Sequence, residues 1–184
     1  MDERKTIKWA LDDVSASSAG GAPFLISYGL TFLIAGILSF ILDEKIIALI
    51  AMFQGTVALP LAFWLERRMG RKRMEPENPL KSFSGQLAVS QALAIPALIV
   101  IFNLNPRAIP VVLGGIAGMH FLPYAWLHRS QAYVFAAIAV ALGTFGLQIL
   151  IGSAAFNYNL ILIAVVYWVA AVLVYRNTQK LLEY

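Results

Sequence analysis

The feature that most constrains this chain is a series of long segments that carry no charged residue. The clearest is Gln131–Gly152, in which 22 consecutive residues contain no Asp, Glu, Lys or Arg. A helix of about 20 apolar residues is long enough to cross the hydrocarbon core of a bilayer. Because such a segment has no polar face to turn toward water, the sequence predicts that lipid surrounds it.

Six segments of this kind follow one another along the chain. They are Pro23–Leu42, Ile46–Leu65, Ser82–Asn103, Ala108–Leu127, Gln131–Gly152 and Asn157–Tyr175. None shows the ten-residue alternation that is typical of transmembrane barrel strands. We therefore predict an all-α integral membrane protein, a bundle of six transmembrane helices over residues 23–175. A tail over residues 1–22 precedes the bundle, and a tail over residues 176–184 follows it.

The overall composition fits a membrane protein and excludes several kinds of chemistry. The chain is 60% hydrophobic and 13% charged, with a mean hydropathy of +0.74, whereas soluble domains are about 25% charged. It has no cysteine, which excludes disulfides, thiolate metal sites and thiol catalysis. It also lacks a P-loop, a GxGxxG motif, an HExxH motif and zinc-ligand spacing. We therefore expect no cofactor, no metal site and no ATP hydrolysis.

The positive residues predict the orientation of the bundle. If the N-terminus is cytoplasmic, twelve Lys and Arg residues lie inside, six of them in the loop over residues 66–81, and only Lys45 and Arg107 lie outside. This bias predicts that both termini are cytoplasmic, which agrees with an even number of spans. We expect the plasma membrane of a prokaryotic cell. The net charge of +4 then reflects topology, and nucleic acid is not expected as a partner. His128 and Arg129 are expected at the cytoplasmic surface, either as a positive anchor or as a contact for a lipid phosphate.

The N-terminal tail has a weak helical pattern of its own. Its apolar residues at helical spacing are Ile7, Ala10, Leu11 and Val14. With Lys5 and Lys8 beside them, this pattern fits a short amphipathic helix on the membrane surface. A frayed polar tail is the alternative. The following stretch, Ser15–Gly21, has the composition of a flexible link into the first span.

The polar residues inside the predicted spans mark a candidate site. No Asp or Glu lies deep in any span, but Gln54, Gln91 and His120 fall near one depth on three consecutive spans. An unpaired amide in hydrocarbon costs several kcal/mol, so we expect these side chains to bond one another or to face a polar pocket. We propose them, with Tyr124 one turn beyond His120, as a substrate-binding site. The alternative is a set of interhelical hydrogen bonds that fixes the register of the helices.

Prolines and glycines add two structural expectations. Pro60, Pro96 and Pro123 each remove a backbone donor, and kinks at these positions would open space beside the polar residues. Gly114 and Gly118 form a GxxxG pair, which is typical of a close helix–helix contact in membranes. Because His120 lies on another face of the same span, that span is expected to be central in the bundle.

The sequence favours one class of function and leaves two others open. The first is a permease or carrier for a small solute, with its site at the membrane midplane. The second is a sensor or accessory subunit that does not transport. It would bind a partner membrane protein, a second copy of the chain, or anionic lipid headgroups at the basic loop over residues 66–81. A lipid-modifying enzyme is the weakest reading, because no set of nucleophile, acid and base is visible. A water-accessible cavity around the polar residues favours the carrier, and a packed centre favours the accessory subunit.

Overall fold

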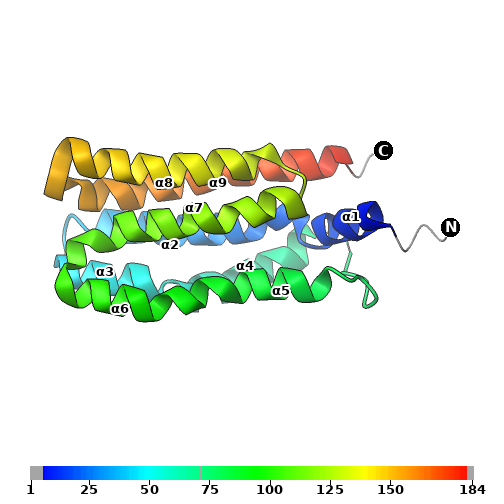
Figure 1. Cartoon of the computed structure of the whole chain (residues 1–184), viewed down its shortest axis with the longest axis horizontal. Helices are drawn as coiled ribbons and strands as arrows, with labels where there is room; N and C mark the ends of the chain where they lie inside the picture. Colours follow the sequence, from blue (N-terminus) through cyan, green and yellow to red (C-terminus); the bar gives the residue numbers. More distant parts are fainter. Residues whose placement is uncertain (1–5, 71, 182–184) are drawn as a thin grey trace.

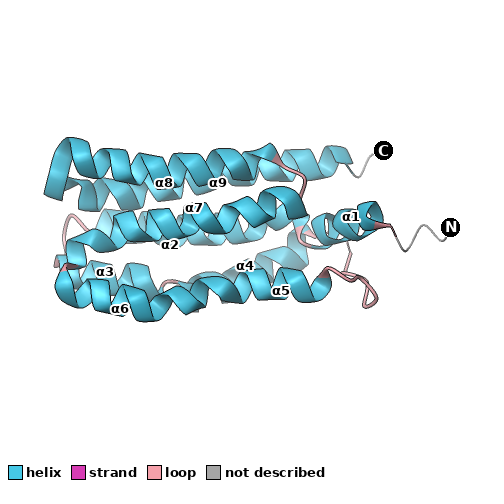
Figure 2. Ribbon diagram, viewed as in Figure 1, coloured by secondary structure: helices cyan, strands magenta, loops and turns pink. Residues whose placement is uncertain are grey.

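The computed structural model describes residues 6–70 and 72–181, and nearly all of them lie in helices (Figure 2). The α-helices are α1 (Ile7–Ser17), α2 (Ala22–Leu38), α3 (Glu44–Phe53), α4 (Gly55–Met69), α5 (Lys81–Ser90), α6 (Ile95–Leu104), α7 (Ile109–Leu127), α8 (Gln131–Ile151) and α9 (Ala155–Leu181). Short 3-10 turns join some of them, namely η2 (Ala19–Gly21), η3 (Gln91–Ala94), η4 (Pro106–Ala108) and η5 (Gly152–Ala154). These described ranges contain no strand, so the predicted all-α fold is confirmed. Arg4, Lys5 and Arg71, which belong to the predicted charge bias, lie outside the described residues.

The long helices lie side by side along one axis (Figure 1). α2 and α7 run through the middle, α8 and α9 lie on one side, and the helices α3 to α6 lie on the other. The contacts agree, because α2 packs on α9 and α4, α7 packs on α8, and α8 packs on α9. α1, the α4–α5 loop, the α7–α8 turn and the last turns of α9 gather at one end, which we call the α1 end. The α2–α3, α6–α7 and α8–α9 connections lie at the opposite, distal end.

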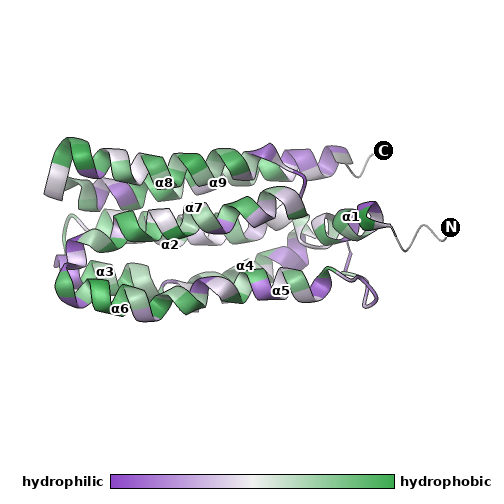
Figure 3. Cartoon of the chain, viewed as in Figure 1, coloured by the Kyte–Doolittle hydropathy of each residue, from purple (hydrophilic) through white to green (hydrophobic). Residues whose placement is uncertain are grey.

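Several helices are long and apolar enough to cross a membrane. Four helical stretches qualify by length and composition, and the bent pair α3–α4 makes a fifth. The four are Ala19–Leu38, Lys81–Leu104, Pro106–Leu127 and Gln131–Lys180. Large hydrophobic side chains such as Leu93 and Leu150 are exposed, and apolar residues colour much of the outside of the bundle (Figure 3). This surface is compatible with a multi-pass membrane protein. The count of six spans and the cytoplasmic position of both termini stay predictions.

Two segments that we predicted as continuous helices are interrupted. α3 and α4 meet at Gln54 with a bend of 40°. α5 and α6 are joined by η3, which ends just before Pro96. Because the ring of Pro96 excludes the carbonyl four residues earlier from a regular helix, the backbone tightens into a 3-10 turn there. Pro60 and Pro123 lie instead inside α4 and α7, which continue past them.

The N-terminal segment forms a helix that packs on protein. Thr6 caps α1 by accepting a hydrogen bond from the backbone N–H of Trp9 at 3.2 Å. Leu11 and Val14 are buried and cluster with Leu127 of α7. This part of the tail is therefore helical in the structure and packs against α7, whereas its place on a membrane surface stays a prediction.

The expected flexible link at Ser15–Gly21 is wrong. These residues end α1 and form η2, and nearly all of them are buried. Gly20 and Gly21 have φ values of +66° and +83°, which a residue with a side chain rarely adopts. A Cβ atom on Gly20 would lie 2.2 Å from Oγ1 of Thr178. The two glycines therefore make a tight, packed turn between α1 and α2, where composition alone indicated flexibility.

A buried carboxylate ties α1 to the loop between α4 and α5. Asp13 accepts hydrogen bonds from Nδ2 of Asn78 at 2.8 Å and from the backbone N–H of Glu75 at 3.0 Å. Nζ of Lys72 lies 3.0 Å from the same carboxylate. Burial opposes ionisation of Asp13, but the hydrogen bonds and Lys72 outweigh it, so the pKa of Asp13 lies below its usual value. We call these four residues the α1 clasp.

Candidate functional site

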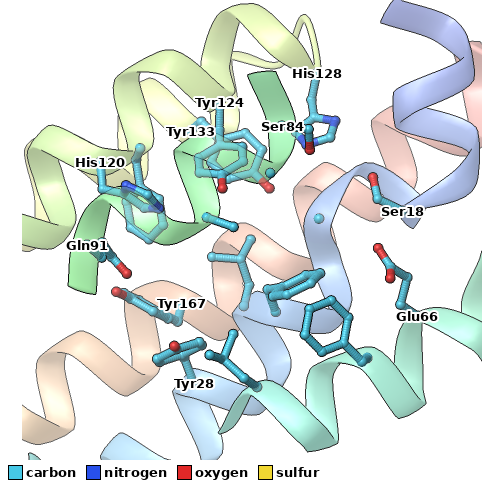
Figure 4. Close-up of a pocket in the computed structure, with 18 residues that line it drawn as sticks. Ser18, Tyr28, Glu66, Ser84, Gln91, His120, Tyr124, His128, Tyr133 and Tyr167 are labelled. Atoms are coloured by element: carbon cyan, nitrogen blue, oxygen red, sulfur yellow. The ribbon is translucent and has the colours of Figure 1, made fainter. Parts of the chain in front are cut away.

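Two adjoining cavities are lined mainly by residues of α2, α4, α5, η3 and α7, with Tyr133 of α8 and Tyr167 of α9. The first has a volume of about 230 Å³, lies toward the α1 end, and is drawn in Figure 4. The second has a volume of about 290 Å³ and is lined by residues of α3, η3, α6 and the first half of α7, toward the distal end. The residues that line both are Tyr28, Leu59, Ala88, Gln91 and Tyr167, which we call the waist. The two cavities thus follow one another along the bundle axis and meet at the waist.

The four residues proposed from the sequence are divided between these cavities. His120 and Tyr124 line the first cavity, Gln54 lines the second, and Gln91 lines both. No hydrogen bond joins any two of them. Nδ1 of His120 lies 3.4 Å from Oγ of Ser90, and its ring meets that of Tyr124 edge to face at 5.1 Å between centroids. Of the two alternatives expected for the midplane residues, direct bonding among the three is absent from the described structure, and all three line cavity space.

Both glutamines lie where their helices are interrupted. Gln54 stands between α3 and α4, and Gln91 is the first residue of η3. Oε1 of Gln54 accepts a hydrogen bond from Oγ1 of Thr31 in α2 at 2.6 Å, which holds the bend against a neighbouring helix. At such a break the regular backbone ladder is interrupted, and the freed polar groups are tolerated at membrane depth where they line a cavity. Sequence reasoning found both glutamines but missed Thr31.

Sequence reasoning also missed most of the aromatic wall of the first cavity. His120, Tyr124 and His128 are spaced four residues apart and share one stripe of α7. Tyr133 of α8 stacks on this stripe, with its ring 5.7 Å from Tyr124 and 5.6 Å from His128. The Tyr133 hydroxyl donates a hydrogen bond to the carbonyl of Gly20 at 2.7 Å. The spacing of four was the available signal, and it would have joined His128 to the site.

His128 is not the surface residue that the sequence led us to expect. It is only 3% exposed, because α1 covers it, and its Nδ1 lies 3.2 Å from Oγ of Ser15. Burial lowers the pKa of His128 to about 3, so the ring is neutral at physiological pH and cannot serve as a positive anchor. Arg129 remains exposed and forms an ion pair with Asp12 of α1.

One carboxylate stands at the α1 end of the first cavity. Glu66, in the last turns of α4, lines the cavity opposite Ser18 (Figure 4). It forms no ion pair or hydrogen bond with any described side chain. Its neighbour Arg68 lies instead over the ring of Trp64, 5.4 Å from the centroid. The described residues that line the cavity include no Lys or Arg, so Glu66 is its one formal charge among them.

The glycine pair on α7 lies against α8. A Cβ atom on Gly114 would lie 2.3 Å from Oγ1 of Thr144, and one on Gly118 would lie 2.7 Å from the carbonyl oxygen of Ala137. Both distances are shorter than real Cβ contacts. The opposite side of α7 carries His120 and faces the first cavity. One side of α7 therefore packs tightly against α8, and the opposite side lines the candidate site.

Comparison with known proteins places this arrangement within one family. The model of the family described as "Family of unknown function (DUF7010)" matches residues 7–177. The matched range begins with α1 and ends near the last turn of α9, so it includes both cavities and the α1 clasp. No curated protein and no solved structure matches the chain.

Proposed function

We propose that this chain, which belongs to the DUF7010 family, is a permease or carrier that moves a small solute across the membrane without ATP hydrolysis. The observation that carries the proposal is the pair of cavities that meet at the waist, beside two helix breaks. Many carriers bind their solute near the bilayer midplane between interrupted helices. Gln54, Gln91 and His120 line these cavities. Gln54 is hydrogen-bonded to Thr31 and His120 lies beside Ser90, but no two of the three bond each other, and the side of each that lines a cavity supports a solute site.

The proposal includes the finer topology of six spans with both termini in the cytoplasm. Gln131–Lys180 is twice the length that one span needs, and its two halves, α8 and α9, pack against each other. Counting them separately, together with the bent pair α3–α4, gives six. The positive-inside bias then assigns the α1 end to the cytoplasm and the distal end to the outside. The setting that we propose is the plasma membrane of a prokaryotic cell, with residues 1–22 and 176–184 as cytoplasmic tails.

The packing supports a division into a fixed frame and a movable part. α2, α7, α8 and α9 bury much of their surface against one another. By contrast, α5 and η3 have no buried residue, and α6 has only Leu98. Elements with few buried contacts open at low free-energy cost. We propose that the segment α5–η3–α6 shifts at Gln91 and opens the waist alternately toward the two ends.

The exposed face of that same segment supports a second candidate function. Val89, Leu93 and Val100 are each more than half exposed, and a partner membrane protein or a second copy of the chain would cover them. In that case the protein is an accessory or sensor subunit. Arg67, Arg68 and other exposed cations of the loop over residues 66–81 would then hold anionic lipid headgroups.

Cysteine labelling separates these functions, because the chain has no native cysteine. Single cysteines replace Gln91 at the waist, Arg73 in the α4–α5 loop, Leu104 at the distal end and Val165 on the exposed face of α9. A charged thiol reagent that does not cross membranes is then added from either side of sealed vesicles. A carrier predicts that Gln91→Cys reacts from both sides, because the waist opens alternately. Val165→Cys, facing lipid, should stay unreactive.

Arg73→Cys and Leu104→Cys report the topology in the same experiment. The six-span arrangement predicts that they react from opposite sides, with Arg73→Cys on the cytoplasmic side. Reaction of both from one side contradicts that arrangement. Protection of Gln91→Cys from both sides contradicts the carrier and favours the accessory subunit.

A further inference from the structure

Aromatic rings form much of the wall of the first cavity. The Phe and Tyr residues that line it are Phe24, Tyr28, Phe63, Phe121, Tyr124, Tyr133 and Tyr167. They belong to α2, α4, α7, α8 and α9, so the rings approach the cavity from several directions (Figure 4). Ring contacts hold them in place, such as Phe121 with Tyr167 at 5.1 Å and Phe24 with Phe63 at 5.3 Å. Because the face of an aromatic ring is electron-rich, such a wall attracts organic cations.

The charges around the cavity also favour a positively charged ligand. Glu66 supplies a carboxylate that forms no ion pair with a described residue, although the positive charge of the neighbouring, exposed Arg67 acts on it. Gln91 and the tyrosine hydroxyls add neutral oxygens. The described lining residues provide no Lys or Arg to receive an anion. A negatively charged solute would therefore meet aromatic rings and a carboxylate of its own sign.

The same lining argues against an inorganic metal ion. Ca²⁺ needs six to eight oxygen ligands, and Mg²⁺ needs six in near-ideal geometry. The described lining offers one carboxylate among many rings and aliphatic side chains. At about 230 Å³ the cavity is also smaller than the roughly 300–1,000 Å³ of drug-sized sites. A small organic group with one positive charge fits both the small volume and the shortage of oxygen ligands.

We infer that the solute is a small organic monocation, an amine or a quaternary ammonium compound, whose charged group binds between the aromatic wall and Glu66. This inference rests on the proposed carrier function and names its substrate class. It assigns two separate roles within the first cavity. The rings select for a cation that has lost its water, and Glu66 gives it a counter-charge at the α1 end.

A matched pair of ligands tests the inference on the full-length protein in lipid nanodiscs. The probes are choline and 3,3-dimethylbutan-1-ol, in which a carbon atom replaces the charged nitrogen and leaves the shape nearly unchanged. Binding is measured by titration calorimetry for the unaltered chain, for Glu66→Gln, and for Glu77→Gln. The last variant removes an equal charge from an exposed loop position outside the cavity.

The inference predicts that choline binds and that the neutral alcohol binds at least about tenfold more weakly. Glu66→Gln should weaken choline binding by about tenfold or more, whereas Glu77→Gln should leave it unchanged. Equal binding of the two ligands overturns the cation and leaves a carrier for a neutral solute, whereas unchanged choline binding by Glu66→Gln overturns the counter-charge role of Glu66. Binding of neither ligand overturns the inference as well, and labelling at Gln91→Cys then decides the carrier function separately. The comparison of the two ligands needs no variant, so it stands even if Glu66→Gln fails to fold.

Discussion

The two halves of this bundle differ in how closely their helices pack. In the frame of α2, α7, α8 and α9, small residues let backbones approach, as where Gly118 meets the carbonyl oxygen of Ala137. In the half formed by α3 to α6, the helices are short and interrupted, and α5 has no buried residue at all. Lipid gives no hydrophobic drive to bring helices together, so close packing and polar contacts decide which helices stay joined. The frame has such contacts along its length, and in the other half α4 packs on α2, whereas α5, η3 and α6 bury almost no residue.

This difference teaches where a functional motion belongs. A rigid frame is needed to hold the rings and His120 in place, and a loosely packed neighbour is needed to open the cavities. The residues of the waist come from both halves, since Tyr28 and Tyr167 belong to the frame and Gln91 belongs to the loose half. Four predictions test this comparison.

The largest effect is expected from Gly118→Leu in the frame. Its side chain has no space between α7 and α8, and the contacting atom is a backbone oxygen that cannot move aside. We expect the free energy of unfolding in mixed micelles to fall by more than about 3 kcal/mol, at the top of the usual range for overpacking. Gly115→Leu on the same helix is the control, because a Cβ there meets nothing within 4 Å. Equal losses for the two variants would mean that α7 and α8 are not closely packed.

A smaller loss is expected from Asp13→Ala in the α1 clasp. The variant removes the acceptor of two hydrogen bonds and the partner of Lys72. Hydrogen bonds to a charged group contribute about 1.5–3 kcal/mol, so we expect a loss of about 2–3 kcal/mol. Limited proteolysis should also cut the α4–α5 loop faster. Glu77→Ala in the same loop is the control, and a loop that stays protected without Asp13 would show that the loose half is not tied at this end.

Acid should weaken the joint between α1 and the frame through His128. The pKa of its ring is lowered by burial to about 3, compared with about 6.5 when unfolded. Between these values the unfolded chain binds the extra proton, so stability is complete above pH 6.5 and falls as the pH drops toward 3. We expect a loss of about 1–2 kcal/mol at pH 5 relative to pH 7.5. His128→Phe keeps a ring beside Tyr133 and should remove the part of this pH dependence that belongs to His128. An unchanged pH profile would mean that the buried ring is not the titrating group.

The smallest effect is expected from Leu93→Ala in the loose half. Leu93 is 79% exposed, so its removal leaves no cavity in the described structure. We expect a change below about 0.5 kcal/mol. Leu160→Ala in α9, at a fully buried position, should cost roughly 2–5 kcal/mol. If Leu93→Ala lowered the free energy of unfolding nearly as much as Leu160→Ala, a partner or second copy must cover this face. That result would favour the accessory function.

Hydropathy predicted the helices of this fold better than their interruptions. Ala108–Leu127 and Gln131–Gly152 were placed to within about a residue of α7 and α8, since a charge-free run ends where the polar turns begin. The prolines predicted kinks, but only Pro96 lies directly beside a break. The bend at Gln54 lies well before Pro60. At this bend Gln54 is hydrogen-bonded to Thr31, a partner 23 residues away, which the local pattern does not contain.

The candidate site was predictable in part, for a related reason. Gln54, Gln91 and His120 were found because polar groups in hydrocarbon are costly and therefore conspicuous. Tyr28 and Tyr167 were not assigned to the site, because tyrosines are ordinary in membrane helices and their place at the waist depends on how distant segments pack. Glu66 is the first residue of the predicted loop over residues 66–81, and only the fold shows that it borders a cavity.

The contacts of α1 also have a consequence for the order of biosynthesis. Asp13 emerges from the ribosome before all its partners, and Asn78 follows it by 65 residues, after α2, α3 and α4 have been made. Ser15 must wait longer, since His128 follows it by 113 residues. The N-terminal helix α1 can therefore begin to dock only after the α4–α5 loop has been synthesised. It completes its contacts only after α7 has been synthesised. A stalled chain that ends before residue 72 should expose α1 to protease, and one that extends well past residue 80 should begin to protect it.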